Sequence, residues 1–169
     1  MTPNLLHDAA VSIMANIAAT FVACGVTAPG VVYVGRQGST ADDECPCDGT
    51  LVGIFQSFRP HAQPRIDLSR CPAARVEASL RIRYSACWAA TIQGNPPRLP
   101  TPTERRAAAQ GQLTAAQVLV QAYYSPSTYR DMPAALDCED LTVAAMDPYV
   151  AGGCAGWQTL VTFTFDAGA

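Results

Sequence analysis

The stretch RVEASLRIRYSAC at residues 75–87 carries the clearest structural pattern in the chain. Apolar and polar side chains alternate along it with a period of two, the pattern of a β-strand with one buried and one polar face. The apolar positions are Val76, Ala78, Leu80, Ile82 and Tyr84, and the polar positions are Arg75, Glu77, Ser79, Arg81, Arg83 and Ser85. The stretch therefore predicts a central strand of a sheet.

Two further strands are predicted before this one. Residues 31–34 are a short β-branched run, and residues 50–59 carry apolar side chains in both alternating registers. The second pattern predicts a strand that is buried on both faces. An acidic, cysteine-bearing loop, ADDECPCDG at 41–49, separates these two strands, and the loop at 60–74 is too long for a tight hairpin.

An N-terminal helix is predicted over residues 3–23. Thr2 is a capping residue, Pro3 follows it in the first helical position, and Gly25 comes after the end. The residues that recur at helical spacing and predict its apolar face are Leu6, Ala10, Ile13, Ile17 and Phe21. Polar residues interrupt the apolar run, so neither a signal peptide nor a membrane-spanning segment is expected.

A second, long helix is predicted after the Pro-rich connector at 93–102. Thr101 stands at its cap, Pro102 at its first position and Glu104 three residues after the cap, which is a capping-box pattern. The helix is expected to run to Tyr124, because Pro126 bounds it.

A short helix or turn at 127–136 and strands at 140–146 and 157–165 complete the predicted elements. Gly152, Gly153 and Gly156 are expected in the turn between the last two strands. Strands that cluster in sequence around a helical insert favour an α+β fold. We expect a single, mostly antiparallel sheet of about five strands, with the N-terminal and long central helices packed on it.

Length and charge narrow the class of function. The chain has 169 residues, which fits one domain over 1–169. Only 15% of its residues are charged, against roughly 25% in average soluble domains, and this shortage indicates surface that partners cover. The net charge of −3 offers no basic footprint for nucleic-acid binding. All 11 basic residues are arginine, which codon usage in a GC-rich genome or a preference for interfaces would explain.

Seven cysteines without an export signal favour folding in a reducing compartment. Oxidation of these cysteines after folding is the alternative. If the strands at 50–59 and 75–87 pair antiparallel with Arg59 near Arg75, Cys47 comes opposite Cys87. A bulge would favour Cys45 as the disulfide partner instead.

Catalytic and metal-binding patterns are weak. Cys45 and Cys47 lack the paired spacing of a zinc site, and their acidic neighbours disfavour a reactive thiolate. His7 and His61 stand in no catalytic motif. We expect no enzymatic activity, no cofactor and no bound metal, with a small cysteine-bearing metal or thiol module as the alternative class.

The order of elements resembles the tail terminator and tail-completion family of long-tailed bacteriophages. An amphipathic helix leads into a short strand and an acidic loop that ends in a Cys-Asp-Gly turn at 47–49. The strand RVEASLRIRYSA (75–86), the helix TPTERRAAAQGQLTAAQVLVQA (101–122) and the terminal segment GGCAGWQTLVTFTF (152–165) follow. The chain departs from a typical member in its seven cysteines and its Pro-rich connector.

The resemblance implies a virion protein without enzymatic activity, present in the bacterial host cytoplasm during assembly. Members of the family form hexameric rings that end the tail tube and present a surface to the head connector, while DNA passes through the lumen. The implied partners are other copies of the chain, the tail tube protein and the head connector or stopper protein, without a membrane. A head-side stopper or adaptor is the alternative within this class.

Three regions are candidates for the subunit or tail-tube interface. They are the acidic loop, the Pro-rich connector and the polar face of the central strand. Their residues are Asp42, Asp43, Glu44, Pro96, Pro97, Arg81 and Arg83, although an ordinary solvated surface would have the same composition. Tyr123, Tyr124 and Tyr129 are further candidates as aromatic anchors, whereas Trp157 is expected to pack in the core.

Overall fold

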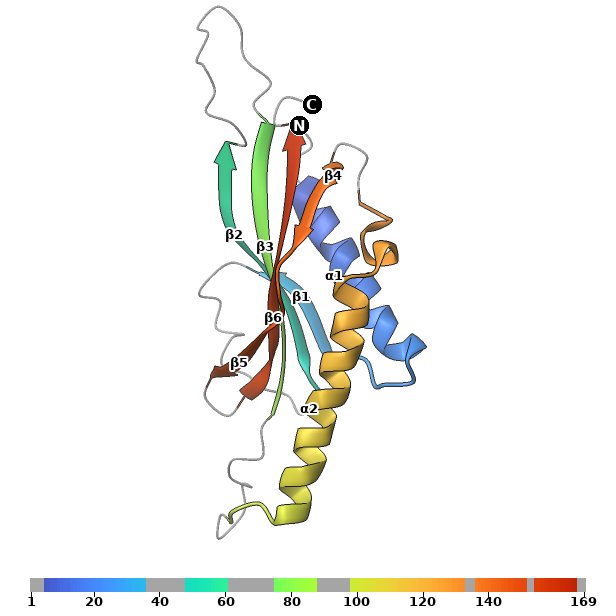
Figure 1. The fold of residues 1–169 in the computed structure, drawn as a ribbon, viewed down its shortest axis with the longest axis vertical. Helices are drawn as coiled ribbons and strands as arrows, with labels where there is room; N and C mark the ends of the chain where they lie inside the picture. The colour runs from blue at the N-terminus through green and yellow to red at the C-terminus, as the bar shows by residue number, and fades with distance from the viewer. Residues whose placement is uncertain are drawn as a thin grey trace, which may run out of the picture.

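A computed structural model describes residues 5–35, 48–60, 75–87, 98–132, 136–151 and 154–166. These residues form an α+β fold in which two helices pack on one face of a six-stranded, mostly antiparallel sheet (Figure 1). The elements are α1 (Leu5–Ala23), β1 (Val31–Gly35), β2 (Thr50–Pro60), β3 (Arg75–Cys87), α2 (Pro102–Tyr123), the 3-10 helix η2 (Pro126–Tyr129), β4 (Leu136–Val143), β5 (Asp147–Ala151) and β6 (Cys154–Asp166). The expected fold class is confirmed.

The sheet has the strand order β1-β2-β3-β6-β4, and β5 also pairs with β6. Among the strands that the structure describes, only β1 and β2 pair in parallel. β4 pairs with the C-terminal half of β6 and β5 with its N-terminal half, so together they line one edge of the sheet. β3 lies in the middle of this order, as its alternating sequence predicts.

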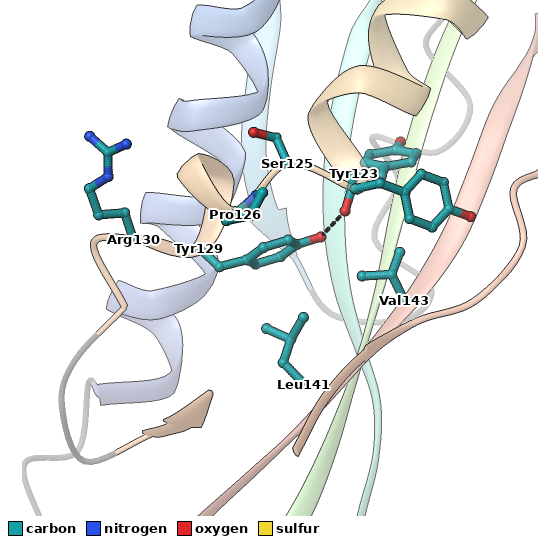
Figure 2. A pocket seen from close by; sticks show the side chains of 8 residues that line it. Tyr123, Ser125, Pro126, Tyr129, Arg130, Leu141 and Val143 are labelled. Atoms are coloured by element: carbon teal, nitrogen blue, oxygen red, sulfur yellow. Dashed lines mark hydrogen bonds between the residues drawn. The ribbon is translucent and has the colours of Figure 1, made fainter. Parts of the chain in front are cut away.

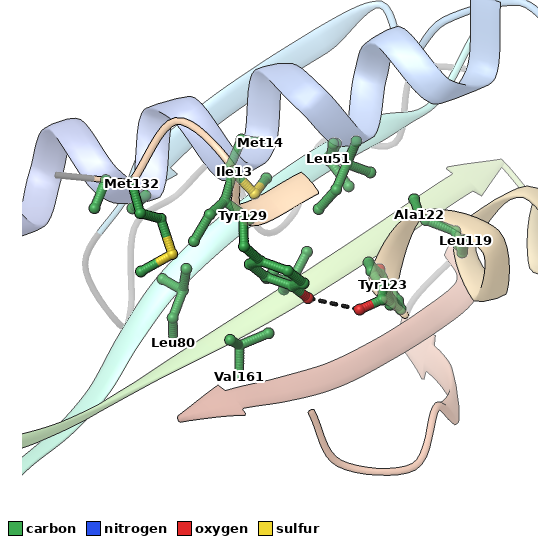
Figure 3. Close-up of a cluster of buried hydrophobic side chains, with 14 of the residues drawn as sticks. Ile13, Met14, Leu51, Leu80, Leu119, Ala122, Tyr123, Tyr129, Met132 and Val161 are labelled. Atoms are coloured by element: carbon green, nitrogen blue, oxygen red, sulfur yellow. Dashed lines mark hydrogen bonds between the residues drawn. The ribbon is translucent and has the colours of Figure 1, made fainter. Parts of the chain in front are cut away.

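The hydrophobic core fills the space between the two helices and the sheet (Figure 3). The predicted apolar face of α1 is confirmed, since Ala10, Ile13, Ile17 and Phe21 are fully buried. Leu6 is only partly buried. Leu80 and Ile82 of β3 and Leu119 of α2 face this layer and are equally inaccessible. Burial of these side chains is the main stabilising contribution to the fold.

Helix α1 is also long and apolar enough to cross a membrane, as judged by its length and composition alone. A core helix and a signal sequence meet the same criterion, because each carries a long apolar run. One side of α1 packs against the sheet and α2.

The strand β2 is buried on both faces, as predicted. Leu51 faces the helices and is 0% exposed, while Val52 and Ile54 face the other way and are 1% and 4% exposed. The predicted antiparallel pairing with β3 is present, but its register is different. Arg59 lies opposite Glu77 rather than near Arg75, and a register shift between Phe55 and Ser57 changes the pairing further along.

The C-terminal half of the chain differs from the prediction in its boundaries. β4 begins at Leu136 rather than at residue 140, and β5 is a strand that the sequence did not predict. β6 begins at Cys154, so Gly156 belongs to a strand and not to a turn. Of the short helix or turn predicted at 127–136, the described residues include the 3-10 helix η2 at Pro126–Tyr129.

Candidate functional site

Arg81 and Arg83 lie on the face of β3 that points away from the helices, but only Arg81 is exposed. Arg83 is 8% exposed, and its guanidinium lies over the ring of Tyr149, 4.5 Å from the ring centroid. The same guanidinium donates a hydrogen bond to the Tyr149 hydroxyl at 3.1 Å. In the single subunit, Tyr149 of β5 therefore covers Arg83, and the role of Arg83 in an interface stays a prediction.

Gly156 explains how Tyr149 reaches Arg83. Tyr149 on β5 is the register partner of Gly156 on β6, which in turn pairs with Ser85 on β3. Because glycine has no side chain, the Tyr149 ring can lie across β6. A Cβ atom on Gly156 would come within 1.9 Å of the Tyr84 carbonyl oxygen, so the strands approach too closely there for any other residue.

The other predicted interface residues lie outside the described part of the chain. These are Asp42, Asp43, Glu44, Pro96 and Pro97, together with Cys45 and Cys47. The predicted pairing of Cys47 or Cys45 with Cys87 therefore remains a prediction.

Cysteines lie at one end of the sheet. Cys87, the last residue of β3, and Cys154, the first residue of β6, are register partners, and both are disulfide-bonded. Cys154 is buried, and the sequence did not single it out. The sequence signal that could have identified Cys154 as buried was its position at the start of β6, in which apolar and polar residues alternate. Cys24 is a free, exposed thiol that donates a hydrogen bond to Gln121 Oε1 at 3.1 Å.

The N-terminal half of α2 extends beyond the core. Its first buried residue is Ala115, and Leu113 is 60% exposed. The helix start is nevertheless well fixed, because the Thr101 hydroxyl and the Glu104 carboxylate form the predicted capping box. Arg98 donates two hydrogen bonds to the same carboxylate, at 2.8 and 2.5 Å. The Arg98 and Thr101 donors lower the pKa of Glu104 to about 2, since they stabilise its charged form.

Exposed apolar side chains lie along both edges of the sheet. Val31 and Val32 of β1 are 42% and 40% exposed at one edge. At the other edge, Val150 of β5 is 76% exposed. The two edges therefore present different strands, one from a parallel pair and one from an antiparallel pair.

A cavity of about 550 Å³ lies between the end of α2, η2 and the segment that carries Leu141 and Val143 (Figure 2). The Tyr129 hydroxyl donates to the Tyr123 carbonyl oxygen at 2.7 Å, and burial raises the pKa of both phenols. Arg130 lies at the rim with its guanidinium turned away from the tyrosines (Figure 2). The lining is thus mainly aromatic and aliphatic.

The tyrosines that the sequence offered as anchors have different roles. Tyr123 and Tyr129 are buried in the core, with exposed fractions of 0% and 8%. Tyr124 is 51% exposed and donates a hydrogen bond to the Ala144 carbonyl oxygen at 3.0 Å. Trp157 is partly buried against the core, as expected, and its ring N–H donates to the Gln112 carbonyl oxygen at 3.2 Å.

Within the described ranges, no group of three or more His, Cys, Asp or Glu side chains could hold a metal ion. No protein-family model matches the sequence, and a search of curated proteins gave no match.

Proposed function

We propose that this chain is a structural subunit of a bacteriophage virion. In this proposal, identical copies form a ring at the head–tail junction, and the family resemblance implies that the ring is a hexamer. The ring caps the tail tube and joins it to the head connector, and DNA passes through its lumen. The proposal rests on the resemblance in element order and on the surface features of the subunit.

The observation that carries the proposal is the difference between the two edges of the sheet. Val32 at the β1 edge and Val150 at the β5 edge leave apolar surface exposed on opposite sides of one subunit. Different surfaces on two sides are what a head-to-tail contact requires, and such contacts close into rings when the rotation between subunits allows it. Covering apolar side chains would favour this association.

Charge supports the same proposal. A net charge of −3 and a pI near 5.2 disfavour retention of DNA in a lumen, because phosphate binding depends on clustered basic side chains. Arg81 is exposed on the sheet and suits a contact with acidic groups of a neighbouring protein.

The direct test is the native mass of the purified protein, alone and after mixing with tail tubes. We expect a species near six times 17.8 kDa, either alone or on the tubes. Val150→Asp should abolish this species, because it places a charge in the contact. Val22→Asp is the matched control, since Val22 is 64% exposed and lies on helix α1 rather than on a strand at either edge. A monomer under both conditions would refute the proposal.

The same experiment separates the alternatives. A stopper or adaptor would bind the head connector but leave tail-tube growth unchecked, whereas a terminator should stop it. A small metal or thiol module would be a monomer, with or without zinc. Mixing it with tail tubes would not change its mass.

A further inference from the structure

Helix α2 carries a second apolar face, on the side opposite its buried one. The buried side chains include Val118 and Leu119, which belong to the core. On the opposite side, Leu113, Val120 and Tyr124 are 60%, 45% and 51% exposed. At 3.6 residues per turn, two half-buried alanines fall close to the same line. We call this surface the outer stripe of α2, and its residues are Ala109, Leu113, Ala116, Val120 and Tyr124.

The residues of the outer stripe follow a coiled-coil spacing. Successive members stand four, three, four and four residues apart. Apolar residues in steps of three and four form a seam along which a second helix packs. The stripe is roughly 22 Å long at the rise of an α-helix. A continuous apolar seam of this length differs from scattered apolar residues, which are normal on a protein surface.

Positive charge flanks the outer stripe at both ends. Arg106 precedes it, and Arg130 lines the same cavity as its last residue, Tyr124. Neither arginine forms an ion pair or a side-chain hydrogen bond with a residue that the structure describes. The nearest acids in the sequence are engaged elsewhere, Glu104 within the helix cap and Asp131 with helix α1. This surface is therefore basic, although the whole chain carries a net charge of −3.

We propose that the outer stripe binds an amphipathic helix of a partner protein, whose apolar seam is flanked by Asp and Glu residues. The partner's apolar side chains pack on Leu113 and Val120, which removes these side chains from water. Its carboxylates lie near Arg106 and Arg130, whose guanidinium groups suit such contacts. One large apolar side chain of the partner enters the cavity of about 550 Å³ at the Tyr124 end of the stripe.

Charge favours an acidic helix over a second copy of this chain. Two α2 helices packed in parallel along their stripes would place Arg106 against Arg106, and antiparallel packing would place Arg106 near Arg130. Either arrangement brings like charges together. Helix α1 supplies only a single acid, Asp8 in its first turn. The outer stripe also differs from the strand edges proposed for ring contacts, so this inference does not depend on the ring.

The test uses the full chain and two synthetic four-heptad peptides. Both peptides carry Ile and Leu along the seam, and one carries Glu and the other Lys at the flanking positions. The acidic peptide should bind saturably by fluorescence anisotropy and should become more helical by circular dichroism. The basic peptide should bind at least about tenfold more weakly, because its charges repel Arg106 and Arg130. Added salt should weaken binding of the acidic peptide.

Variants locate the contact on α2. Leu113→Gln should weaken binding of the acidic peptide about tenfold, since it removes an apolar contact. Arg106→Gln should weaken it about two- to fivefold and reduce its salt dependence. Val11→Gln is the matched control and should not change binding, because Val11 is 44% exposed on α1. Glutamine is a good helix former, so each variant should keep its fold.

Three results would overturn the proposal. The first is the absence of saturable binding of the acidic peptide up to about 1 mM. The second is equal binding of the acidic and basic peptides, or binding that Leu113→Gln leaves unchanged. The third is dimerisation of the chain that Leu113→Gln abolishes, since a second copy would then occupy the outer stripe.

Discussion

Ile82 and Arg81 are neighbours on β3 with opposite environments, and they make a matched pair for testing the strand. Ile82 is 0% exposed in the core, whereas Arg81 is exposed on the other face. Ile82→Asp should destabilise the fold by about 3–5 kcal/mol, because it buries a charge without a partner. Arg81→Asp should leave the free energy of unfolding nearly unchanged. Urea denaturation measures both, and a fully stable Ile82→Asp protein would contradict the assignment.

Two glycines make a second matched pair. Gly156→Ala should cost about 1–3 kcal/mol, because the new methyl group overlaps the Tyr84 backbone and the strands must move apart. Gly111 lies on α2 with nothing within 4 Å of an added Cβ, so Gly111→Ala should stabilise by about 0.5–1 kcal/mol. Thermal unfolding compares them, and equal shifts for the two variants would show that the β3–β6 approach is not tight.

Patterns of single residues identify buried positions better than they identify positions that a partner protein can reach. The alternation in β3 correctly predicts that Leu80 and Ile82 are buried. It assigns Arg83 to an accessible polar face, although Tyr149 covers it. That contact depends on a strand 66 residues away in sequence and on the glycine between them, so a local pattern cannot indicate it.

At the scale of elements, the start of α2 gives a pH-dependent prediction. The folded pKa of Glu104 is about 2, below its ordinary value of 4.5, so its stabilising contribution is complete above pH 4.5. The contribution should be lost as the pH falls towards 2. An NMR titration of Glu104 should show the low midpoint, and Arg98→Ala should move it back up. A wild-type midpoint near 4.5 would contradict the observed contacts.

The cap hydroxyl can be tested separately. Thr101→Ala removes the hydrogen bond to the Glu104 amide and should cost about 1 kcal/mol of helix stability. Because residues 102–114 lie outside the core, the loss should appear as faster amide exchange in the first turns of α2. Thr103→Ala, two residues further along the chain, is the control and should have little effect. Equal exchange in the two variants would argue against the capping role.

Strongly patterned elements could be predicted from the sequence, and weakly patterned ones could not. Helical periodicity and the Thr101–Glu104 box located both α-helices. β5 was missed because Asp147 and Pro148 are typical of turns, and proline is tolerated there only because β5 is an edge strand. The cavity beside Tyr123 could not be predicted either, since its walls come from three separate segments.

For the whole molecule, the charge balance predicts weak DNA binding. With a net charge of −3, the protein should bind double-stranded DNA only weakly at physiological salt, which suits a lumen through which DNA passes. An electrophoretic mobility assay measures this directly, with DNA in the absence of protein as the reference. Tight, salt-dependent binding would contradict the proposed passive lumen.

The central claim is that copies of this chain form a closed ring at the head–tail junction. Electron cryomicroscopy of the assembled particle tests it most directly. We predict a ring of identical subunits at the head-proximal end of the tail tube, with Arg81 at a contact between proteins. A particle that contains the chain only as an isolated monomer, or a ring in which Arg81 lines the pore, would contradict the account.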